Sequence, residues 1–328
     1  MKAKNLFMKI LGVFIALILA GTVAPAATII VLETFDFPGT GNNTLPQKIN
    51  DGGAIVGVVI DAAGVTKGFV RSRAGHFSNA FVEPNDTGDL TQGRGINNAR
   101  VVCGEYLNGT DGTFHGYFRA HAMFREFDVT DALDTIPLGI NNVGDFVGTI
   151  ILSDGTEPAF LSLAGNVTMF SVPDGTATLA YSLNSSQETL GYYIDAAGAT
   201  HGYLRASDGT LTFPIDPAGS TGTVLFGNND LNWVVGRYAD SAGVTHGLFF
   251  ETPDDITTFD YPGAAGFTSL NGINQDGYIC GRYLDSAGIA HGFLGRVDPN
   301  GTVQPDQSKS PATPVKPVYP SRPAAPAL

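Results

Sequence analysis

The sequence predicts an all-β fold, a six-bladed β-propeller with four antiparallel strands per blade and a ring closed by the N-terminal strand. Three observations support this. A unit of about 45 residues recurs six times, turn signals divide each unit into short strands, and the strand that the last unit lacks lies at the start of the chain. Beyond the N-terminal apolar run, no stretch has the 3.6-residue apolar periodicity of a long helix.

The repeat is marked by an asparagine that lies seven residues before a glycine. The asparagines, spaced 43 to 47 residues apart, are Asn50, Asn97, Asn141, Asn184, Asn229 and Asn274. The matching glycines are Gly57, Gly104, Gly148, Gly191, Gly236 and Gly281. Six spaced matches predict one structural unit that repeats around a ring.

Each unit is divided by turn chemistry. An Asn/Asp/Gly cluster follows the first strand, and an Asp-x-x-Gly turn, such as Asp195 to Gly198, follows the second. This turn suits a three-residue hairpin loop with glycine in the left-handed conformation. Asp208-Gly209 is predicted as a two-residue turn with positive φ at both positions. Longer segments with Pro and Gly, such as 262–266, should connect the blades.

The last unit, from about Thr268 to Val297, lacks a fourth strand. The missing copy lies at the other end of the chain, where the sequence at 35–39 (Phe-Asp-Phe-Pro-Gly) repeats that at 259–263 (Phe-Asp-Tyr-Pro-Gly). We therefore expect residues 29–37 to pair with the third strand of the last blade. Such a closure removes the open sheet edge that a linear array would expose.

The chain divides into three regions. Residues 1–26 are typical of a secretion signal, with Lys2, Lys4 and Lys9 before an apolar run and a small-x-small cleavage site that ends at Ala26. Cleavage would leave no membrane span, so we expect a secreted or periplasmic/extracellular protein. The propeller is expected over 27–302, and a Pro-rich disordered tail over 303–328.

Charge and cysteine content limit the classes of partner. Without the signal the chain has 15 basic and 31 acidic residues, a formal charge of −16 that disfavours nucleic acid. We expect a monomer whose partner is an extracellular protein or a glycan, and no cofactor. Cys103 and Cys280 stand where other units have Val or Leu, so they are predicted to be buried and unbridged.

Turn lengths predict a row of three polar side chains across the strands of four blades. In blade four, Tyr193 stands opposite His201, and His201 stands opposite Asp216. The other rows are Tyr106, His115 and Asp128 in blade two; Tyr238, His246 and Asp260 in blade five; and Tyr283, His291 and Asp36 in blade six. Blade one has Val59, Lys67 and Glu83, where Lys67 and Glu83 form a different but complementary pair, and blade three has Ile150, Pro158 and Ser171.

We interpret these rows as structural hydrogen-bond networks, with catalysis and ligand contact as alternatives. They contain no evident nucleophile with an oxyanion hole, and four copies related by rotation are unlike an active site. The aspartates of the Asp-x-x-Gly turns (Asp61, Asp195, Asp240 and Asp285) are assigned to turn formation, since a calcium site needs several oxygen ligands close together. No catalytic, cofactor-binding or metal-binding residue is predicted.

The repeat resembles a known family. Its pattern, Ile-Asn-x-x-Gly-x-Ile-Val-Gly-x-Tyr-x-Asp-x-x-Gly-x-x-His-Gly-Phe and then Phe-Asp-x-Pro-Gly-Ala, is similar to the bacterial extracellular repeats called the HAF family, over about residues 28–302. Units one and three depart from it, with Lys67 and Pro158 in place of His and with Val59 and Ile150 in place of Tyr. The resemblance implies an exported bacterial β-propeller and brings no catalytic residue.

Two classes of function remain. The preferred hypothesis is a non-catalytic extracellular binding or scaffold module for a protein or glycan. The alternative is an extracellular hydrolase or lactonase-like enzyme with its site at the mouth of the central channel, which would need carboxylates and histidines specific to particular blades. The sequence shows no such cluster, although loops near Asp86, Asp89 and Arg94, or near Asp131 and Asp134, are open candidates.

Overall fold

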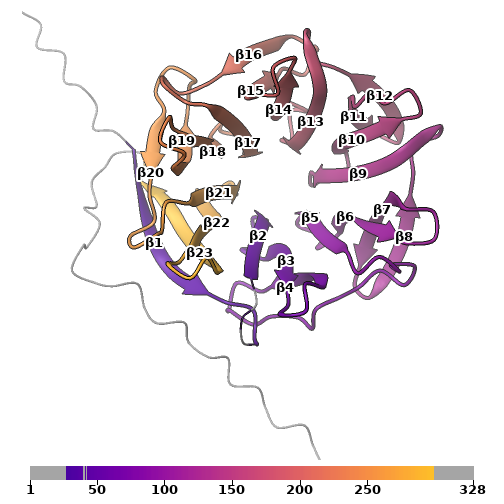
Figure 1. Ribbon diagram of the computed structural model, residues 1–328, viewed down its shortest axis with the longest axis horizontal. Helices are drawn as coiled ribbons and strands as arrows, with labels where there is room; N and C mark the ends of the chain where they lie inside the picture. Colours follow the sequence, from indigo (N-terminus) through magenta and orange to yellow (C-terminus); the bar gives the residue numbers. More distant parts are fainter. Residues whose placement is uncertain (1–26, 40, 42, 299–328) are drawn as a thin grey trace, which may run out of the picture.

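The computed structural model describes residues 27–39, 41 and 43–298, and over them the chain is a six-bladed β-propeller (Figure 1). In this part of the chain 23 strands form six sheets around a central axis. The expected signal at 1–26 and the expected tail at 303–328 lie outside the described residues. The predicted fold class is confirmed.

The strands of each blade follow one another from the axis outward, and blade six takes its outermost strand from the N-terminus. In that order they are β2 (Asn43–Ile49), β3 (Ile55–Ile60) and β4 (Thr66–Arg71) in blade one; β5 (Thr91–Ile96), β6 (Val102–Asn108), β7 (Thr113–Ala120) and β8 (Met123–Phe127) in blade two; β9 (Ala132–Ile140), β10 (Phe146–Leu152), β11 (Ala159–Leu163) and β12 (Asn166–Phe170) in blade three; β13 (Gly175–Leu183), β14 (Thr189–Asp195), β15 (Thr200–Arg205) and β16 (Leu211–Ile215) in blade four; β17 (Gly222–Asn228), β18 (Val234–Ala239), β19 (Thr245–Phe250) and β20 (Thr257–Phe259) in blade five; and β21 (Thr268–Ile273), β22 (Tyr278–Leu284), β23 (Ala290–Asp298) and β1 (Thr28–Phe35) in blade six.

The ring closes as the sequence predicts. Strand β1 pairs antiparallel with β23, from Thr28 opposite Asp298 to Phe35 opposite Gly292. The Phe35 ring covers Gly292, where an added Cβ would lie 2.6 Å from the ring. The closing strand is therefore fitted to its partner by shape as well as by backbone hydrogen bonds, and the edge of β23 is covered.

Blade one differs from the others at its rim. Its sheet has three strands, and two isolated bridges, from Phe77 to Arg71 and from Phe81 to Gly68, occupy the outer position. The Phe77 ring packs edge-on against Phe69, with 5.4 Å between centroids. The connection to blade two is the longest between repeats, and aromatic packing along it replaces a regular fourth strand.

The hairpin turns show one confirmed prediction and one error. In the Asp195 turn, Gly198 has φ of +84°, and the Asp195 carboxylate accepts two backbone N–H groups of its own loop. At the next turn only Gly209 has positive φ, and the Ala206 N–H donates to the carbonyl of Thr210 at 2.8 Å. That loop therefore has three residues, so the predicted two-residue turn is wrong.

Every innermost strand contains a β-bulge opposite the repeated glycine. In blade four, pairing passes from Ala180 opposite Gly191 to Ser182 opposite Leu190, which leaves Tyr181 without a partner. A Cβ on Gly191 would lie 1.8 Å from the carbonyl oxygen of Leu179, so the position admits only glycine without backbone movement. A bulge re-aims the extra side chain. The six bulged residues are Gln47, Arg94, Leu138, Tyr181, Phe226 and Asn271.

The repeated asparagines form a closed ring directly after the innermost strands, each of them three residues beyond a bulged residue. Each Nδ2 donates to the backbone carbonyl of the next asparagine at 2.9 to 3.4 Å, and Asn274 returns to Asn50. Each Oδ1 accepts backbone N–H groups in its own turn, as Asn229 does from Trp233. All six are buried. The asparagine that marks the repeat thus both shapes its turn and links neighbouring blades.

Both cysteines are free and buried, as predicted. Burial raises the pKa of the Cys103 and Cys280 thiols to about 12. Each sulfur packs beside the glycine after a bulge, Gly95 or Gly272. The two thiols therefore act as small apolar side chains inside their blades.

Candidate functional site

The structure brings together all twelve side chains of the predicted rows. His Nδ1 lies 2.6 to 2.8 Å from the carboxylate in each pair, and the Tyr and His ring centroids are 5.0 to 5.4 Å apart with planes 24° to 31° from parallel. The pairs are His115 with Asp128, His201 with Asp216, His246 with Asp260, and His291 with Asp36. The histidines lie on the third strand of each blade, away from the axis.

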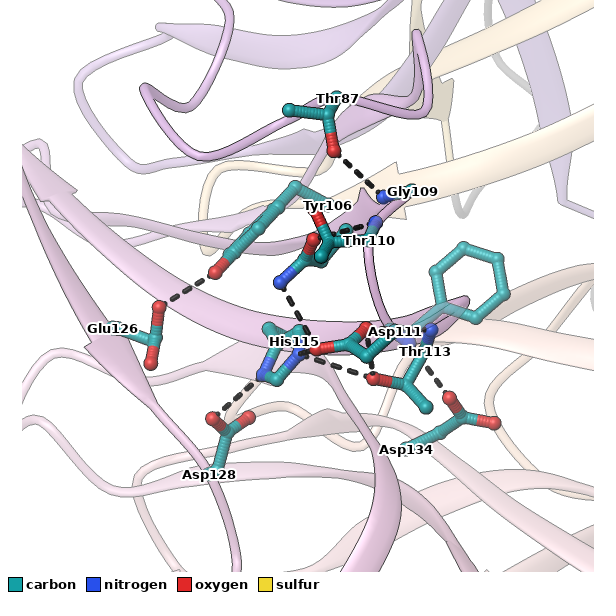
Figure 2. A network of polar contacts seen from close by, with 12 residues as sticks. Thr87, Tyr106, Gly109, Thr110, Asp111, Thr113, His115, Glu126, Asp128 and Asp134 are labelled. Carbon is teal, nitrogen blue, oxygen red and sulfur yellow. Dashed lines mark hydrogen bonds and ion pairs between the residues drawn. The ribbon is translucent and has the colours of Figure 1, made fainter.

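A second carboxylate, which the sequence reasoning missed, faces the other ring nitrogen. His201 Nε2 lies 3.3 Å from Asp195, the aspartate of the preceding turn, and Figure 2 shows the corresponding contact of His115 with Asp111 in blade two. The distances in blades five and six are 3.4 and 3.3 Å. The available signal was a spacing, since an aspartate precedes the histidine by six residues in blades four, five and six.

Blade one corrects one predicted pair. Lys67 Nζ lies 3.0 Å from the turn residue Asp61, and the Glu83 carboxylate instead accepts the backbone N–H of Asn85. The lysine occupies the place of the histidine and takes the contact with the turn carboxylate. The predicted Lys67–Glu83 pair is wrong because that prediction overlooked the turn aspartate as a partner.

The two carboxylates set the protonation of each histidine. Partial burial lowers the pKa of the four imidazoles, but the hydrogen bonds and negative charge of the paired aspartates outweigh it. The net effect raises each pKa above the usual 6.5. A protonated histidine donates from both ring nitrogens, which matches a position between two acceptors.

Blade two contains the one cluster in the described part of the chain that could hold a metal ion. His115, Glu126 and Asp128 each place a ligand atom within 4.8 Å of the others. Figure 2 shows that these groups already have partners: Asp128 and Asp111 flank the imidazole, and the Tyr106 hydroxyl donates to Glu126 at 2.6 Å. The hydrogen-bond row accounts for this cluster without a metal ion.

The five residues left open as candidates fall into three groups. The carboxylates of Asp86 and Asp134 accept backbone N–H groups, which is a turn or strand role. Asp89 and Asp131 have positive φ, of 58° and 67°, at bends of the chain. Arg94 is different, because it is a bulged residue and lies at the central channel.

A cavity of about 460 Å³ lies at the channel end opposite the asparagine ring, on the side of blades four, five and six. Five of the six bulged residues line it, together with three residues that directly follow a repeated glycine on a second strand. The bulged ones are Gln47, Arg94, Tyr181, Phe226 and Asn271, and the others are Tyr192, Arg237 and Arg282. The bulged residues occupy equivalent positions in the six blades, and no two of them are of the same type.

The arginines of this cavity differ in their partners. Arg94 forms a bidentate ion pair with the buried Glu105, at 2.6 to 3.1 Å. Among the described residues, Arg237 and Arg282 contact no carboxylate and form no hydrogen bond; both guanidinium groups lie over the Phe267 ring, 5.5 and 5.7 Å from its centroid. Two cations thus face the cavity with only aromatic rings as partners.

Burial lowers the pKa of two of these cations. It lowers the pKa of Arg237 and, with the like charges of Arg237 and Arg94, lowers that of Arg282 to about 10. For Arg94, burial acts in the same direction, but the charge and hydrogen bonds of Glu105 outweigh it and raise the pKa. All three guanidinium groups are charged at neutral pH.

Lys48, next to the bulged Gln47, lies inside the channel. Its ammonium donates to the backbone carbonyls of Phe226 and Asn271 and lies 5.8 Å from the Tyr181 centroid. Burial lowers its pKa to about 8. Lys48 also lines a smaller cavity, of about 70 Å³, on the asparagine side. It therefore stands between the two cavities.

Sequence reasoning missed this site. The available signal was the residue three positions before each repeated asparagine, which is Gln, Arg, Leu, Tyr, Phe or Asn in the six units. A position that varies in every copy of a regular repeat is free of the constraint that holds the others. A hydrolase site needs carboxylates and histidines, and the described lining residues of this cavity include neither.

Comparison with solved structures agrees with the fold. The chain is similar to TolB from Acinetobacter baumannii (TM-score 0.52, 11% identity, 74% of this chain and 65% of that one), so it spans just under two thirds of that protein. It is also similar to a protein assigned as TolB from Agrobacterium tumefaciens (0.55, 14%, 84% and 99%) and to the fucose-specific lectin from Aleuria aurantia (0.50, 10%, 84% and 99%). The likeness is one of fold.

Sequence comparisons add no closer relative. No protein-family profile matches the chain, and no curated protein matches it. The structurally similar proteins include both lectins and TolB, so the fold is compatible with more than one function. A functional assignment therefore depends on the site.

Proposed function

We propose that this chain is an exported, non-catalytic binding β-propeller that holds a ligand in the 460 Å³ cavity of its central channel. The observation that carries the proposal is a contrast between two sets of positions. The residues that shape turns and link blades recur from unit to unit, whereas the bulged residues at the cavity differ in all six. A ligand without six-fold symmetry needs such a difference.

The chemistry of the lining supports binding rather than hydrolysis. It offers guanidinium groups, phenol hydroxyls, carboxamides and aromatic rings, and its described residues include no histidine or carboxylate. Hydrolysis by general acid–base catalysis relies on such groups with a pKa near the working pH. The volume is in the range of pockets that hold small molecules, about 300–1,000 Å³.

We also propose that the protein acts outside the cytoplasm, as the expected signal at 1–26 suggests, and that it belongs to the HAF repeat family that it resembles. No helix in the described residues is long and apolar enough to cross a membrane. The presence of a fucose-specific lectin among proteins of this fold makes a glycan the first ligand class to test.

A glycan array tests the proposal. The secreted form is compared with Tyr181→Ala, which removes a cavity wall, and with Met123→Ala, which changes a side chain that is 77% exposed on the outermost strand β8. We expect Tyr181→Ala to weaken binding by at least about tenfold, as for a buried aromatic contact. Met123→Ala should bind as the wild type does.

The opposite pattern would contradict the proposal. Binding that survives Tyr181→Ala and is lost in Met123→Ala would assign the ligand to the blade rim. Thermal melting of each variant separates loss of binding from loss of fold. The Tyr181 ring packs edge-on against Phe226 at 5.1 Å, so a modest decrease in melting temperature is expected.

A further inference from the structure

We propose that the ligand of the channel cavity is a saccharide that carries an oxyanion group, bound between Arg237 and Arg282. This inference rests on the proposed function and names the ligand class. The shared chemistry is an oxyanion on a hydroxylated ring, which a uronate, a sulfate ester or a phosphate ester can supply.

The channel carries a local excess of positive charge. Lys48, Arg94, Arg237 and Arg282 lie in or beside the cavity, and within the described part of the chain Glu105 is the one carboxylate paired with any of them. The whole chain has a formal charge of −13. An acidic protein thus concentrates cations in the interior of its ring, where they do not serve solubility. Buried charges are costly unless they are paired.

Arg94 lines the same cavity as Arg237 and Arg282 but differs from them in having a partner. Its guanidinium receives a bidentate carboxylate from within the chain, whereas Arg237 and Arg282 face the cavity with aromatic rings alone. They occupy equivalent positions, directly after the repeated glycine, in adjacent blades, and both lie over Phe267. Two such guanidinium groups form a site for one oxyanion, whose oxygens can accept from both.

A buried acceptor in the cavity indicates that the ligand also carries a hydroxyl. Asn271 is 1% exposed and lines the cavity, and its Oδ1 is a buried acceptor without a hydrogen-bond partner among the described residues. A buried acceptor needs a donor, which a simple oxyanion lacks and a sugar hydroxyl supplies. Gln47 and Thr245, which carry a carboxamide and a hydroxyl, line the same cavity.

Aromatic side chains form further walls of the cavity and suit a sugar ring. Tyr181 and Tyr192 lie side by side, with 5.8 Å between centroids, and Phe226 packs against Tyr181. All three line the cavity with the arginines. Flat apolar faces beside hydrogen-bonding groups suit a sugar ring, which has an apolar face and a polar edge.

The experiment measures dissociation constants by calorimetry for matched sugar pairs. Glucuronate and galacturonate are compared with glucose and galactose, and glucose 6-sulfate and glucose 6-phosphate form the two other arms. The proteins are the secreted form, Arg237→Gln, Arg282→Gln, Arg282→Lys and the control Arg125→Gln. Arg125 is exposed on β8, so its variant makes the same change of charge away from the channel.

We expect at least one acidic sugar to bind about tenfold or more tightly than its neutral counterpart. Arg237→Gln and Arg282→Gln should each weaken it by about tenfold to a hundredfold, as for a hydrogen bond to a charged group. Arg282→Lys should fall between, since lysine keeps the charge and loses the planar fork. Arg125→Gln should have no effect. The tightest of the three acidic arms then identifies the oxyanion.

Equal affinity for acidic and neutral sugars, or affinity unchanged in both Gln variants, would overturn the inference. If Tyr181→Ala still abolishes binding in that case, the proposed function stands and only the ligand class is wrong. If no substitution of a cavity residue affects binding, both the proposed function and the proposed ligand class are wrong. Inorganic phosphate binding as tightly as the acidic sugars would also overturn it, because the hydroxylated ring would contribute nothing. Melting temperatures check that each variant is folded.

Discussion

At the scale of single residues, each row histidine lies between two carboxylates, and this gives its contribution to stability a definite pH dependence. The folded pKa is raised above the unfolded value of 6.5. The added stability is therefore fully present below pH 6.5 and is lost as the pH rises through the folded pKa. An aspartate with a lowered pKa would show the opposite trend.

His201→Ala tests this sign. Without the imidazole, Asp216 loses its partner, and the free energy of unfolding should fall by about 1–3 kcal/mol. Chemical denaturation should show a larger loss at pH 5.5 than at pH 9. His76→Ala, at an exposed position outside the rows, is the control. An equal loss at both pH values would mean that the protonated imidazole has no special role.

Lys48 shows the reverse case, a half-buried cation inside the channel whose charge is unfavourable in the folded state. Its pKa falls from 10.5 to about 8, so the folded state loses the proton first as the pH rises. The penalty is complete below pH 8 and disappears toward pH 10.5. It amounts to about 3 kcal/mol at most.

Lys48→Met should therefore stabilise the protein at pH 7, by no more than that amount. The difference in unfolding free energy between Lys48→Met and the wild type should shrink as the pH rises from 8 to 10. A difference that grows over this interval would show that the ammonium stabilises the fold through its contacts with the Phe226 and Asn271 carbonyls.

At the scale of strands and turns, some features could be read from the sequence and others could not. Turn lengths fix register, so His201 could be placed opposite Tyr193 by counting. The prediction that His201 meets Asp216 also holds, but only because a bulge between Gly202 and Leu204 offsets the extra residue of the three-residue loop. A bulge adds one residue without a turn signal, so Tyr181 could not be placed in the same way. The fold and the rows follow from repetition, whereas the cavity depends on a local irregularity.

The repeated glycine is the sequence trace of that irregularity. A Cβ on Gly191 would meet the Leu179 carbonyl at 1.8 Å, whereas one on Gly198 would meet nothing within 4 Å and would suffer only from its positive φ. Gly198→Ala should cost about 1 kcal/mol. Gly191→Ala should cost about 3 kcal/mol or more, because backbone must move. Urea denaturation measures the free energy of unfolding of both variants. A smaller loss for Gly191→Ala than for Gly198→Ala would show that the bulge does not require glycine at this position.

At the scale of the whole molecule, the ring depends on a strand from the opposite end of the chain. Removal of residues 27–37 should leave the edge of β23 open and His291 without Asp36. We expect aggregation on size-exclusion chromatography. A synthetic peptide of residues 27–37, added in trans, should restore the monomeric peak by strand addition. A truncated protein that stays monomeric and melts like the intact one would contradict closure by β1.

Across the whole molecule, the residues that hold the ring together differ from those that we propose bind the ligand. The asparagine ring, the glycines and the Tyr–His–Asp rows recur and link strands or blades, whereas Arg237, Arg282 and the bulged residues break the symmetry at one end of the channel. We propose that the ligand is bound by the second set alone.

The most direct test is to measure the dissociation constant and the melting temperature together for the wild type, Arg282→Gln and His201→Ala, with the tightest-binding acidic sugar. We predict that Arg282→Gln loses affinity by about tenfold or more and keeps its melting temperature, while His201→Ala keeps its affinity and melts at a lower temperature. If His201→Ala instead loses the ligand without a change in melting temperature, and Arg282→Gln binds normally, the ligand belongs to the rows and the account is wrong.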